Sequence, residues 1–183
     1  MPTPLLIRAD AKSPCNIRDS LQEIQAEYLA WVRGHMTPYS PAPADQGTGM
    51  PQPEGYVDIV QTLCATEPLG NVLYLIEVDG KAAGMCGLRR LGGNTAEIKR
   101  MYVRPAYQGK QIGAYALRGL LTDASRWGFT VICLDTALFM QTAHRLYEAY
   151  GFTECAAYEG SEVPAALHGQ WRFMQLVISQ TSP

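Results

Sequence analysis

The chain has 183 residues, which is long enough to bury a full hydrophobic core and short enough to form one domain. Apolar residues make up 47% of it and charged residues 17%, a composition typical of a globular protein and not of a disordered one. The formal net charge of −2 argues against a general nucleic-acid or membrane-surface binder. No apolar run has the length that crosses a bilayer, and the N-terminus lacks the pattern of a secretory signal, so we expect a cytoplasmic protein.

The first part of the chain predicts a strand, a helix, a loop and a second helix. Residues 5–10 have the pattern of a short strand. Apolar residues recur at steps of three or four over residues 17–32, which is typical of an amphipathic helix, and Gly34 is expected to end it. Residues 36–53 are rich in proline and glycine and predict a loop. A helix is expected to follow over residues 55–65.

The middle of the chain predicts an antiparallel meander of three strands. β-branched and aromatic residues alternate with turn signals, of which Asp79-Gly80 is the strongest. A glycine-rich turn at residues 92–94 provides the second reversal. The strands are expected at residues 71–78, 82–90 and 95–103.

The second half predicts a β-α-β unit and a short C-terminal continuation. Apolar residues recur every four positions from Ile112, so a helix is expected to about Trp127, where Gly128 ends it. The apolar run at 130–136 is typical of a strand in the covered centre of a sheet. This strand should lie parallel to the strand at 95–103, with a right-handed crossover. Further elements are expected at residues 139–150 (helix), 152–157 (strand) and 172–178 (strand).

The five cysteines are widely spaced and include no CxxC pair. We therefore predict reduced, structural thiols and no metal site. The cysteines stand at Cys15, Cys64, Cys86, Cys133 and Cys155.

A short basic loop joins the third meander strand to the long helix. It contains Gly109 and Gly113, which let a ligand approach the backbone closely. The free N–H groups at the start of a helix and the helix dipole both favour an anion at this place. The loop also follows the C-terminal end of a strand, where open α/β sheets bind ligands. Because a Walker loop and a dinucleotide fingerprint are both missing, a phosphate-bearing ligand of another type is expected.

The loop sequence QGKQIG, residues 108–113, resembles the Gln/Arg-x-x-Gly-x-Gly/Ala signature of the GNAT family of N-acetyltransferases. The segment AHRLYEAYGF, residues 143–152, is similar to the second motif of that family, and the order of the elements also agrees. The resemblance covers about residues 4–180. It implies one N-acetyltransferase domain over residues 4–180, with the α/β GNAT (acyl-CoA N-acyltransferase) fold: a mixed central sheet of about six to seven strands flanked by about four helices.

The resemblance implies acetyl-CoA as cosubstrate and no metal. An acetyl group would move to a primary amine of a small metabolite, an amino acid or a peptide, by direct attack of the amine on the thioester. In the family the pantetheine arm lies along the central strand where it splays from the next parallel strand, so Met101, Tyr102 and Val103 would supply backbone contacts. The pyrophosphate would be bound by Gln108, Gly109, Lys110, Gln111, Ile112, Gly113 and Ala114. The charge of Lys110 suits a phosphate, although an exposed solubilising lysine explains it equally well.

The same resemblance assigns two catalytic residues. Tyr147 matches the family tyrosine that protonates the coenzyme thiolate, and a tyrosine pKa near ~10 against a thiol pKa of about 8.5 is consistent with that step. Tyr147 also fits the apolar face of its helix, so core packing is an alternative. Glu97 stands where several family members place a general base. Its alternative is a glutamate on the strand surface paired with Lys99, because residues i and i+2 share a face.

Two positions depart from the family pattern. Gln111 replaces the second glycine of the loop, and we expect it to take an ordinary helical or bridging backbone with its side chain near the phosphates. Met140 replaces a frequent asparagine, which removes a polar contact to the coenzyme.

The amine acceptor is not specified by the sequence. Aromatic residues are candidates for lining its site, although core packing explains each of them equally well, and the loop at 36–53 is a candidate lid. The aromatic candidates are Tyr28, Trp31, Tyr56 and Tyr158. Two other functions stay open: a non-catalytic acyl-CoA-binding sensor module, and an oligomeric interaction protein that pairs through its last strands. A homodimer, common in the resembled family, is a further option.

Overall fold

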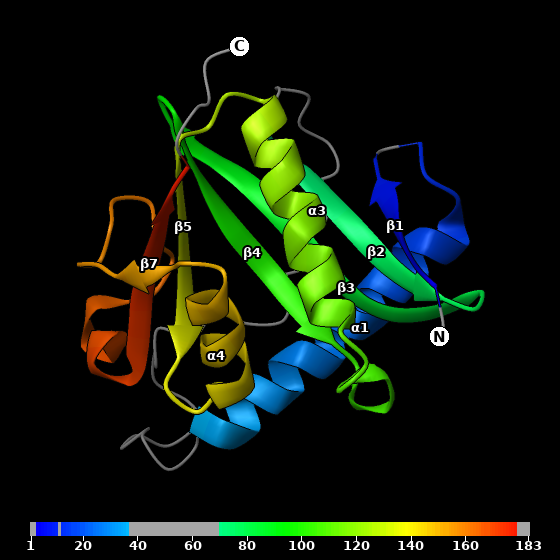
Figure 1. Ribbon diagram of the computed structural model, residues 1–183. Coiled ribbons are helices and arrows are strands. Elements are labelled where there is room, and N and C mark those ends of the chain that lie inside the picture. The colour runs from blue at the N-terminus through cyan, green and yellow to red at the C-terminus, as the bar shows by residue number, and fades with distance from the viewer. Residues whose placement is uncertain (1–2, 11, 37–69, 179–183) are drawn as a thin grey trace.

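The computed structural model describes residues 3–10, 12–36 and 70–178 of the chain. Its centre is a seven-stranded sheet with the strand order β1-β2-β3-β4-β5-β7-β6 (Figure 1). This mixed sheet confirms the predicted α/β class. The strands are β1 Pro4–Ala9, β2 Val72–Val78, β3 Lys81–Gly92, β4 Thr95–Val103, β5 Val131–Ala137, β6 Thr153–Glu154 and β7 Trp171–Val177.

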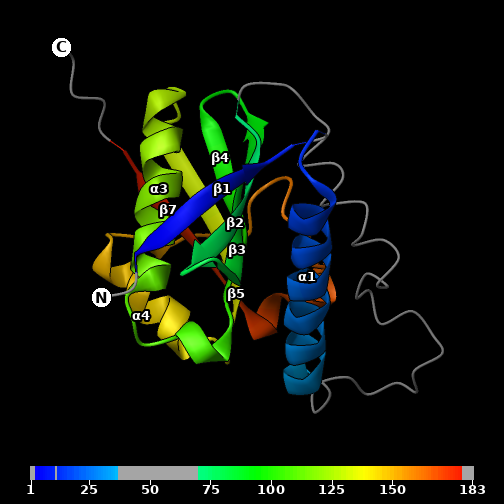
Figure 2. The same cartoon turned by 90° about the vertical axis from the view of Figure 1, so that its right-hand side faces the viewer.

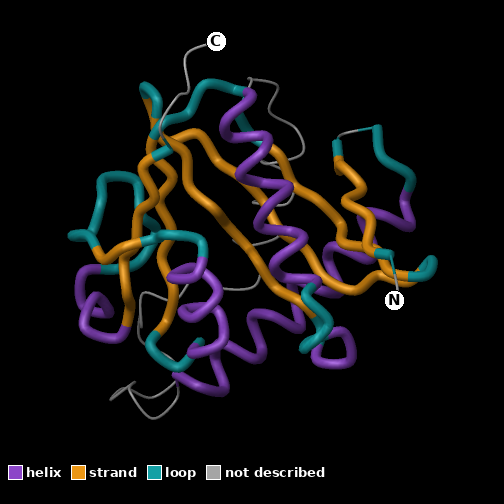
Figure 3. Tube along the Cα trace, in the orientation of Figure 1, coloured by secondary structure: helices purple, strands orange, loops and turns teal. Residues whose placement is uncertain are grey.

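Helices cover both faces of the sheet. Helix α1 (Cys15–Met36) lies on one face, while α3 (Ile112–Arg126) and α4 (Gln141–Ala149) lie on the other (Figure 2). Two short 3-10 helices, η2 (Pro105–Tyr107) and η3 (Ala165–Gln170), lie in the connections between these elements. Figure 3 shows the same trace with helices, strands and loops in different colours. The helix expected at 55–65 and nearly all of the expected loop at 36–53 lie outside the described residues. None of the described helices is long and apolar enough to cross a membrane.

Helix α1 continues past the glycine that was expected to end it. It runs through Gly34 to Met36, so the predicted stop was wrong. A helical glycine costs only about 1 kcal/mol relative to alanine. The last turns still bury Val32 and Met36, each 6% exposed, and this burial outweighs the local preference of one exposed glycine.

The meander and the β-α-β unit form as predicted. Strands β2, β3 and β4 pair antiparallel in sequence order, and β4 pairs parallel with β5 across the α3 crossover. The strand expected at 152–157 is shorter, because only Thr153 and Glu154 pair with β7. After Cys155, whose N–H donates to Phe173 O, the chain leaves the sheet edge and turns towards β3 and β4.

The two parallel strands stay paired over a short distance only. Thr95, Ala96 and Glu97 of β4 pair with Val131, Ile132 and Cys133 of β5. Within the described residues, β4 beyond Glu97 pairs with β3 alone. The second half of β4 therefore has backbone groups on the β5 side that are available to a ligand.

A bulge in β4 decides which way its side chains point. From Lys99 to Tyr102 the strand takes three steps while β3 takes two, and Arg100 has a left-handed φ of 56°. Ala96 and Ile98 face the α3 side, so alternation without a bulge would send Tyr102 there as well. The extra residue reverses the alternation, so Met101 and Val103 pack on the α3 side and Tyr102 on the α1 side.

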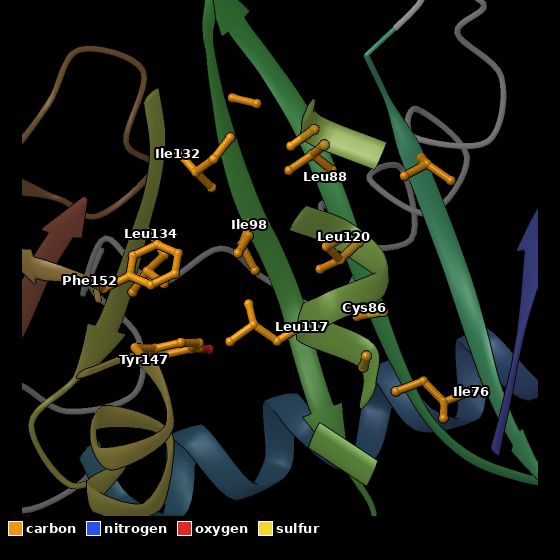
Figure 4. Close-up of a cluster of buried hydrophobic side chains, with 14 of the residues drawn as sticks. Ile76, Cys86, Leu88, Ile98, Leu117, Leu120, Ile132, Leu134, Tyr147 and Phe152 are labelled. Carbon is orange, nitrogen blue, oxygen red and sulfur yellow. The ribbon is translucent and has the colours of Figure 1, made fainter. Parts of the chain in front are cut away.

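The core divides between the two faces of the sheet. The larger part lies between the sheet, α3 and α4 and includes Ile98, Leu117, Leu134 and Tyr147 (Figure 4). The smaller part lies under α1 and includes Leu21, Ile24, Leu73, Leu75, Met85 and Tyr102. The four cysteines among the described residues are free thiols, of which Cys86 and Cys133 are buried and Cys15 is exposed. Cys64 lies outside the described residues.

Candidate functional site

The loop before α3 has an unusual backbone. Gly109 has a φ of 74°, and Gln111, the N-cap residue of α3, has a φ of 58° and a ψ of 14°. The expectation of an ordinary helical or bridging backbone at Gln111 was therefore wrong. The chain leaves η2 and enters α3 within a few residues, and Gln111 O already accepts from Tyr115 N at 3.0 Å. Such a tight entry requires the left-handed conformation, which glycine adopts without strain and glutamine does not.

The start of α3 is open to an anion. The N–H groups in the first turn of any helix lack an intrahelical acceptor. Within the described part of the chain, the Gln111 side chain, at the N-cap, makes no capping hydrogen bond to them. Two left-handed residues flanking Lys110 are typical of a backbone that turns successive N–H groups to one side. A Cβ built on Gly113 would lie 3.5 Å from Leu146, so the helix start also packs closely against α4.

Two polar side chains of this loop donate to nearby main-chain carbonyl groups. Gln108 Nε2 donates to Val103 O at 2.9 Å, which ties the loop to the end of β4. Lys110 Nζ donates to Ala106 O at 2.9 Å and lies 5.6 Å from the centre of the Tyr107 ring. The lysine charge is thus held beside the open helix start.

Met140 stands at the N-cap of α4, where the resembled family often has asparagine. Its sulfur accepts from Thr136 Oγ1 at 3.6 Å. The residue therefore connects the end of β5 to α4, and its side chain offers a ligand no strong donor.

Tyr147 reaches from α4 towards the interval between β4 and β5. Its side chain is 6% exposed, and Figure 4 shows its hydroxyl end directed towards Leu117 of α3. Burial raises the pKa of Tyr147 above its ordinary value near 10, and Tyr28 and Asp135 raise it further. Tyr28 belongs to α1, on the other face of the sheet.

Glu97 is completely buried, on the α1 side of the last paired position of β4. Its Oε2 accepts from Arg89 Nε at 2.9 Å and Nη2 at 2.5 Å, and its Oε1 accepts from the Tyr158 hydroxyl at 2.7 Å. Lys99 Nζ lies 3.4 Å from Oε1. Of the alternative interpretation, a surface glutamate paired with Lys99, the pairing is present and the surface position is not.

Burial raises the pKa of Glu97, while Lys99 and Arg89 lower it through their charges and Tyr158 lowers it through its hydrogen bond. The net direction is upward. The carboxyl therefore combines a raised proton affinity with a fixed position, which are properties of a general base.

Glu97 belongs to a larger group of charges on the α1 side of the sheet, which we name the charge cluster. Besides Glu97 it contains two further carboxylates, Asp135 and Glu162, and three cations. Its members are Arg89, Glu97, Lys99, Arg100, Asp135, Tyr158 and Glu162. Apart from Glu97, Lys99 and Tyr158, these residues were not expected from the sequence. The consecutive charges of Lys99 and Arg100 inside a central strand signal buried ions on β4, but they do not identify the partners from other segments.

Aromatic rings of α1 meet rings from β4 and the β5–α4 loop next to the charge cluster. Trp31 contacts Tyr28, Tyr102 and Phe139, with ring centres 5.0–6.3 Å apart, and His35 stacks on Phe139 at 4.5 Å. Two of the expected aromatic candidates, Tyr28 and Trp31, are thus brought together, and Tyr158 lies in the charge cluster instead. Tyr56 lies outside the described residues. His35 and Phe139 were not expected.

A comparison with protein families identifies the fold of this site. The family model described as "Acetyltransferase (GNAT) family" matches residues 30–152. The match includes β2 to β5, α3, α4 and the loop at 108–114, whereas β1, β6, β7 and most of α1 lie outside it.

Two curated relatives share less than a third of their aligned residues with this chain. An N-acetyltransferase of Schizosaccharomyces pombe, described as uncharacterized, is 28% identical over 102 residues, which is 55% of this chain and 63% of that protein. The N-acetylaspartate synthetase of Mus musculus is 29% identical over 99 residues, 54% of this chain and 33% of that protein. The matched part therefore spans less than two thirds of either relative.

Solved structures support the fold over nearly the whole chain. An acetyltransferase from Streptococcus agalactiae has a TM-score of 0.68 at 17% identity and covers 94% of this chain and 98% of its own. The PaiA N-acetyltransferase from Thermoplasma acidophilum, solved in complex with coenzyme A, has a TM-score of 0.64 at 16% identity and covers 96% and 99%. At these identities the likeness concerns the fold.

Proposed function

The chain belongs to the acetyltransferase (GNAT) family, and from this premise we propose that it transfers an acetyl group from acetyl-CoA to a primary amine. The observation that carries the proposal is the early end of the β4–β5 pairing beside the open start of α3. The unpaired edge of β4 offers backbone groups to a pantetheine arm, and the helix start offers N–H groups to a pyrophosphate. The two sites adjoin each other in the order that the coenzyme requires.

The coenzyme would be held by backbone more than by side chains. Met101, Tyr102 and Val103 would bind the pantetheine arm along β4. The loop Gln108 to Ala114 would bind the pyrophosphate through the N–H groups that flank Gly109, Gln111 and Gly113. Lys110 would add a positive charge beside them.

Acetyl transfer then requires two proton movements. The neutral amine attacks the thioester carbonyl, a C–N bond forms, the C–S bond breaks, and the coenzyme leaves as a thiolate. Tyr147 would donate a proton to that sulfur, since a tyrosine hydroxyl is protonated at neutral pH.

The amine must also lose a proton, and Glu97 would take it. Because Glu97 has no exposed surface, the proton would have to reach it through a neighbour. The Tyr158 hydroxyl, which donates to Oε1 at 2.7 Å, would pass its proton inward as it accepted one from the amine. The raised pKa of the Glu97 carboxyl supports this direction of transfer.

The relatives suggest a range of acceptors. They include N-acetylaspartate synthetases, and the solved structures of the same fold include a ribosomal-protein-S18-alanine N-acetyltransferase from Escherichia coli. A small metabolite, an amino acid or a peptide N-terminus is therefore the acceptor class that we propose.

A paired experiment tests the proposal. Calorimetry measures whether acetyl-CoA binds, and a free-thiol assay over a panel of amines, amino acids and short peptides measures whether it is consumed. We expect binding together with amine-dependent thiol release. Coenzyme binding without thiol release across the panel would instead identify a sensor, and no binding at all would contradict the proposed site.

A further inference from the structure

Three cations of the charge cluster converge on one carboxylate that the sheet does not provide. Arg89 stands on β3, and Lys99 and Arg100 stand on β4. Glu162 lies in the loop before η3, and its oxygens lie 2.9 Å from Arg89 Nη1, 3.2 Å from Lys99 Nζ and 3.7 Å from Arg100 Nη2. The side chains of Lys99 and Arg100 are only 5% and 7% exposed, whereas that of Glu162 is 34% exposed. A carboxylate from the solvent side therefore covers buried cations.

The charge balance of the cluster shows what this carboxylate does. The strands supply three positive charges, on Arg89, Lys99 and Arg100, and two negative charges, on Glu97 and Asp135. One positive charge therefore remains on the sheet, and Glu162 neutralises it. Because an uncompensated buried charge is costly, any group that replaces Glu162 must also carry one negative charge.

The position of these cations relates them to the proposed reaction. Arg100 precedes Tyr102 by two residues on β4, within the bulge. Tyr102 is in the segment that we assign to the pantetheine arm, and the Glu97–Tyr158 pair lies on the other side of Lys99. A molecule whose carboxylate lay on the cations would thus have its amine a few bonds away, between the proton acceptor and the thioester.

We propose that Arg89, Lys99 and Arg100 form a carboxylate subsite for the amine acceptor, which Glu162 occupies until a free amino acid or a similar aminocarboxylic acid displaces it. The inference rests on the proposed acetyltransferase function and narrows its acceptor class. Peptide N-termini and simple amines lack a carboxylate near the amine and would leave Glu162 in place. Glu162 then acts as an internal competitor that excludes them.

The test compares each amino acid with its own primary amide and its decarboxylated amine, on the full chain. The amide loses its α-ammonium proton more readily than the acid does, so intrinsic reactivity favours the amide and a preference for the acid must come from the protein. Binding is measured as the rise of the thermal unfolding midpoint in the presence of coenzyme A, and turnover as thiol release from acetyl-CoA. We expect at least one free amino acid to raise the midpoint and to exceed its amide about tenfold in kcat/KM.

Variants assign that preference to the cluster. Arg100→Gln should reduce the acid-to-amide ratio to near one. Arg104→Gln is the matched control, since Arg104 pairs with Glu23 and Glu27 of α1 outside the cluster, and it should keep the ratio. Glu162→Gln should lower KM for the acid severalfold and leave KM for the amide unchanged.

The possible outcomes test the carboxylate subsite and the proposed acetyltransferase function separately. Amides or amines that match the acids in binding and turnover would overturn the subsite while acetyl transfer stands. A midpoint raised by the acid and not by the amide, without thiol release from any amine, would support the subsite and contradict the proposed function. If Arg100→Gln fails to fold, the comparison of acid with amide on the unaltered chain still decides.

Discussion

The two faces of β4 are built on opposite principles. On the α3 side the strand presents Ile98, Met101 and Val103 to an apolar core, where burial itself is stabilising. On the α1 side the same strand buries Glu97 and Lys99, whose desolvation opposes folding unless every charge is paired. Apolar residues of similar size would pack on the second face at lower cost.

The apolar α3 side of β4 therefore accounts for the stability of the fold, and the charge cluster on the α1 side accounts for the candidate site. The α3 face explains why the sheet, α3 and α4 form one core and why Tyr147 is held rigidly. The charge cluster does not improve on an apolar face in stability, and perturbed buried charges beside a ligand site are typical of functional groups. We therefore expect changes on the two faces to have different consequences.

The largest expected effect is on turnover, at Tyr147. Tyr147→Phe removes the proposed proton donor, so kcat should fall about 100-fold while coenzyme binding by calorimetry stays unchanged. The control is Tyr150→Phe at the C-cap of the same helix. The Tyr150 hydroxyl accepts from Arg118 at 2.9 Å and donates to Ala114 O at 3.3 Å, so this variant should keep kcat within about twofold. Equal losses in both variants would refute the assignment to Tyr147.

The second effect is on stability, at the close approach of β3 to the bulge. A Cβ at Gly84 would lie 2.3 Å from Tyr102 O, a backbone atom that cannot move without shifting β4. Gly84→Ala should therefore lower the free energy of unfolding by about 3 kcal/mol, measured by urea denaturation. Gly169→Ala is the control, because no described atom lies within 4 Å of its Cβ, and it should change stability by less than about 0.5 kcal/mol. A tolerated Gly84→Ala would argue against the bulge.

The third effect is on the pH dependence of stability. Two carboxylates of the charge cluster change the free energy of unfolding in opposite directions as the pH rises. Burial acts to raise the pKa of Glu162, but Lys99, Arg89 and Arg100 outweigh it and hold the pKa below its ordinary value near 4.5. Its contribution is therefore present above that value and is lost as the pH falls through the lowered pKa. Glu97 has a raised pKa, so its contribution decreases as the pH rises from that ordinary value through the raised one.

Unfolding free energies of two variants across pH measure this contrast. Glu162→Gln should cost about 1 kcal/mol at neutral pH and should approach the unaltered chain in acid. Glu97→Gln should remove the decreasing component, so its stability should rise more steeply with pH. If both substitutions changed the slope in the same direction, the assigned pKa directions would be wrong for one of them.

The smallest effect concerns the strained backbone of the loop. Gln111→Gly should raise the free energy of unfolding by about 1 kcal/mol, because glycine adopts the left-handed φ without strain. Lys110→Gly is the matched control one residue away, where φ is not positive, and it should lower stability instead. The opposite ranking of the two variants in thermal denaturation would contradict the described loop.

The elements that the sequence predicted share a periodic apolar pattern or a strong turn signal. The meander, the parallel β4–β5 pair and α3 show such patterns. The apolar residues of each element face a core that extends along the whole element, so their spacing reveals the element. The loop at 108–114 was predicted from its motif, because its glycines stand between the end of a strand pattern and the start of a helix pattern.

The features that were missed depend on contacts between distant segments. The bulge at Arg100 needs the close approach of Gly84, and nothing local to β4 signals it. The left-handed backbone of Gln111 contradicts the local preference of glutamine. The charge cluster brings Arg89 to Glu162 across 73 positions in the chain, so residue spacing could not reveal it. Gly34 had a clear local signal, and tertiary packing overrode it.

The central claim is that acetyl-CoA lies along the unpaired part of β4 with its pyrophosphate at the start of α3. A crystal structure of the chain with bound coenzyme A tests it most directly. We predict pyrophosphate oxygens within hydrogen-bonding distance of main-chain N–H groups between Gly109 and Ala114, and the coenzyme sulfur beside the Tyr147 hydroxyl. A coenzyme bound elsewhere, with β4 and β5 joined beyond Glu97, would contradict the account.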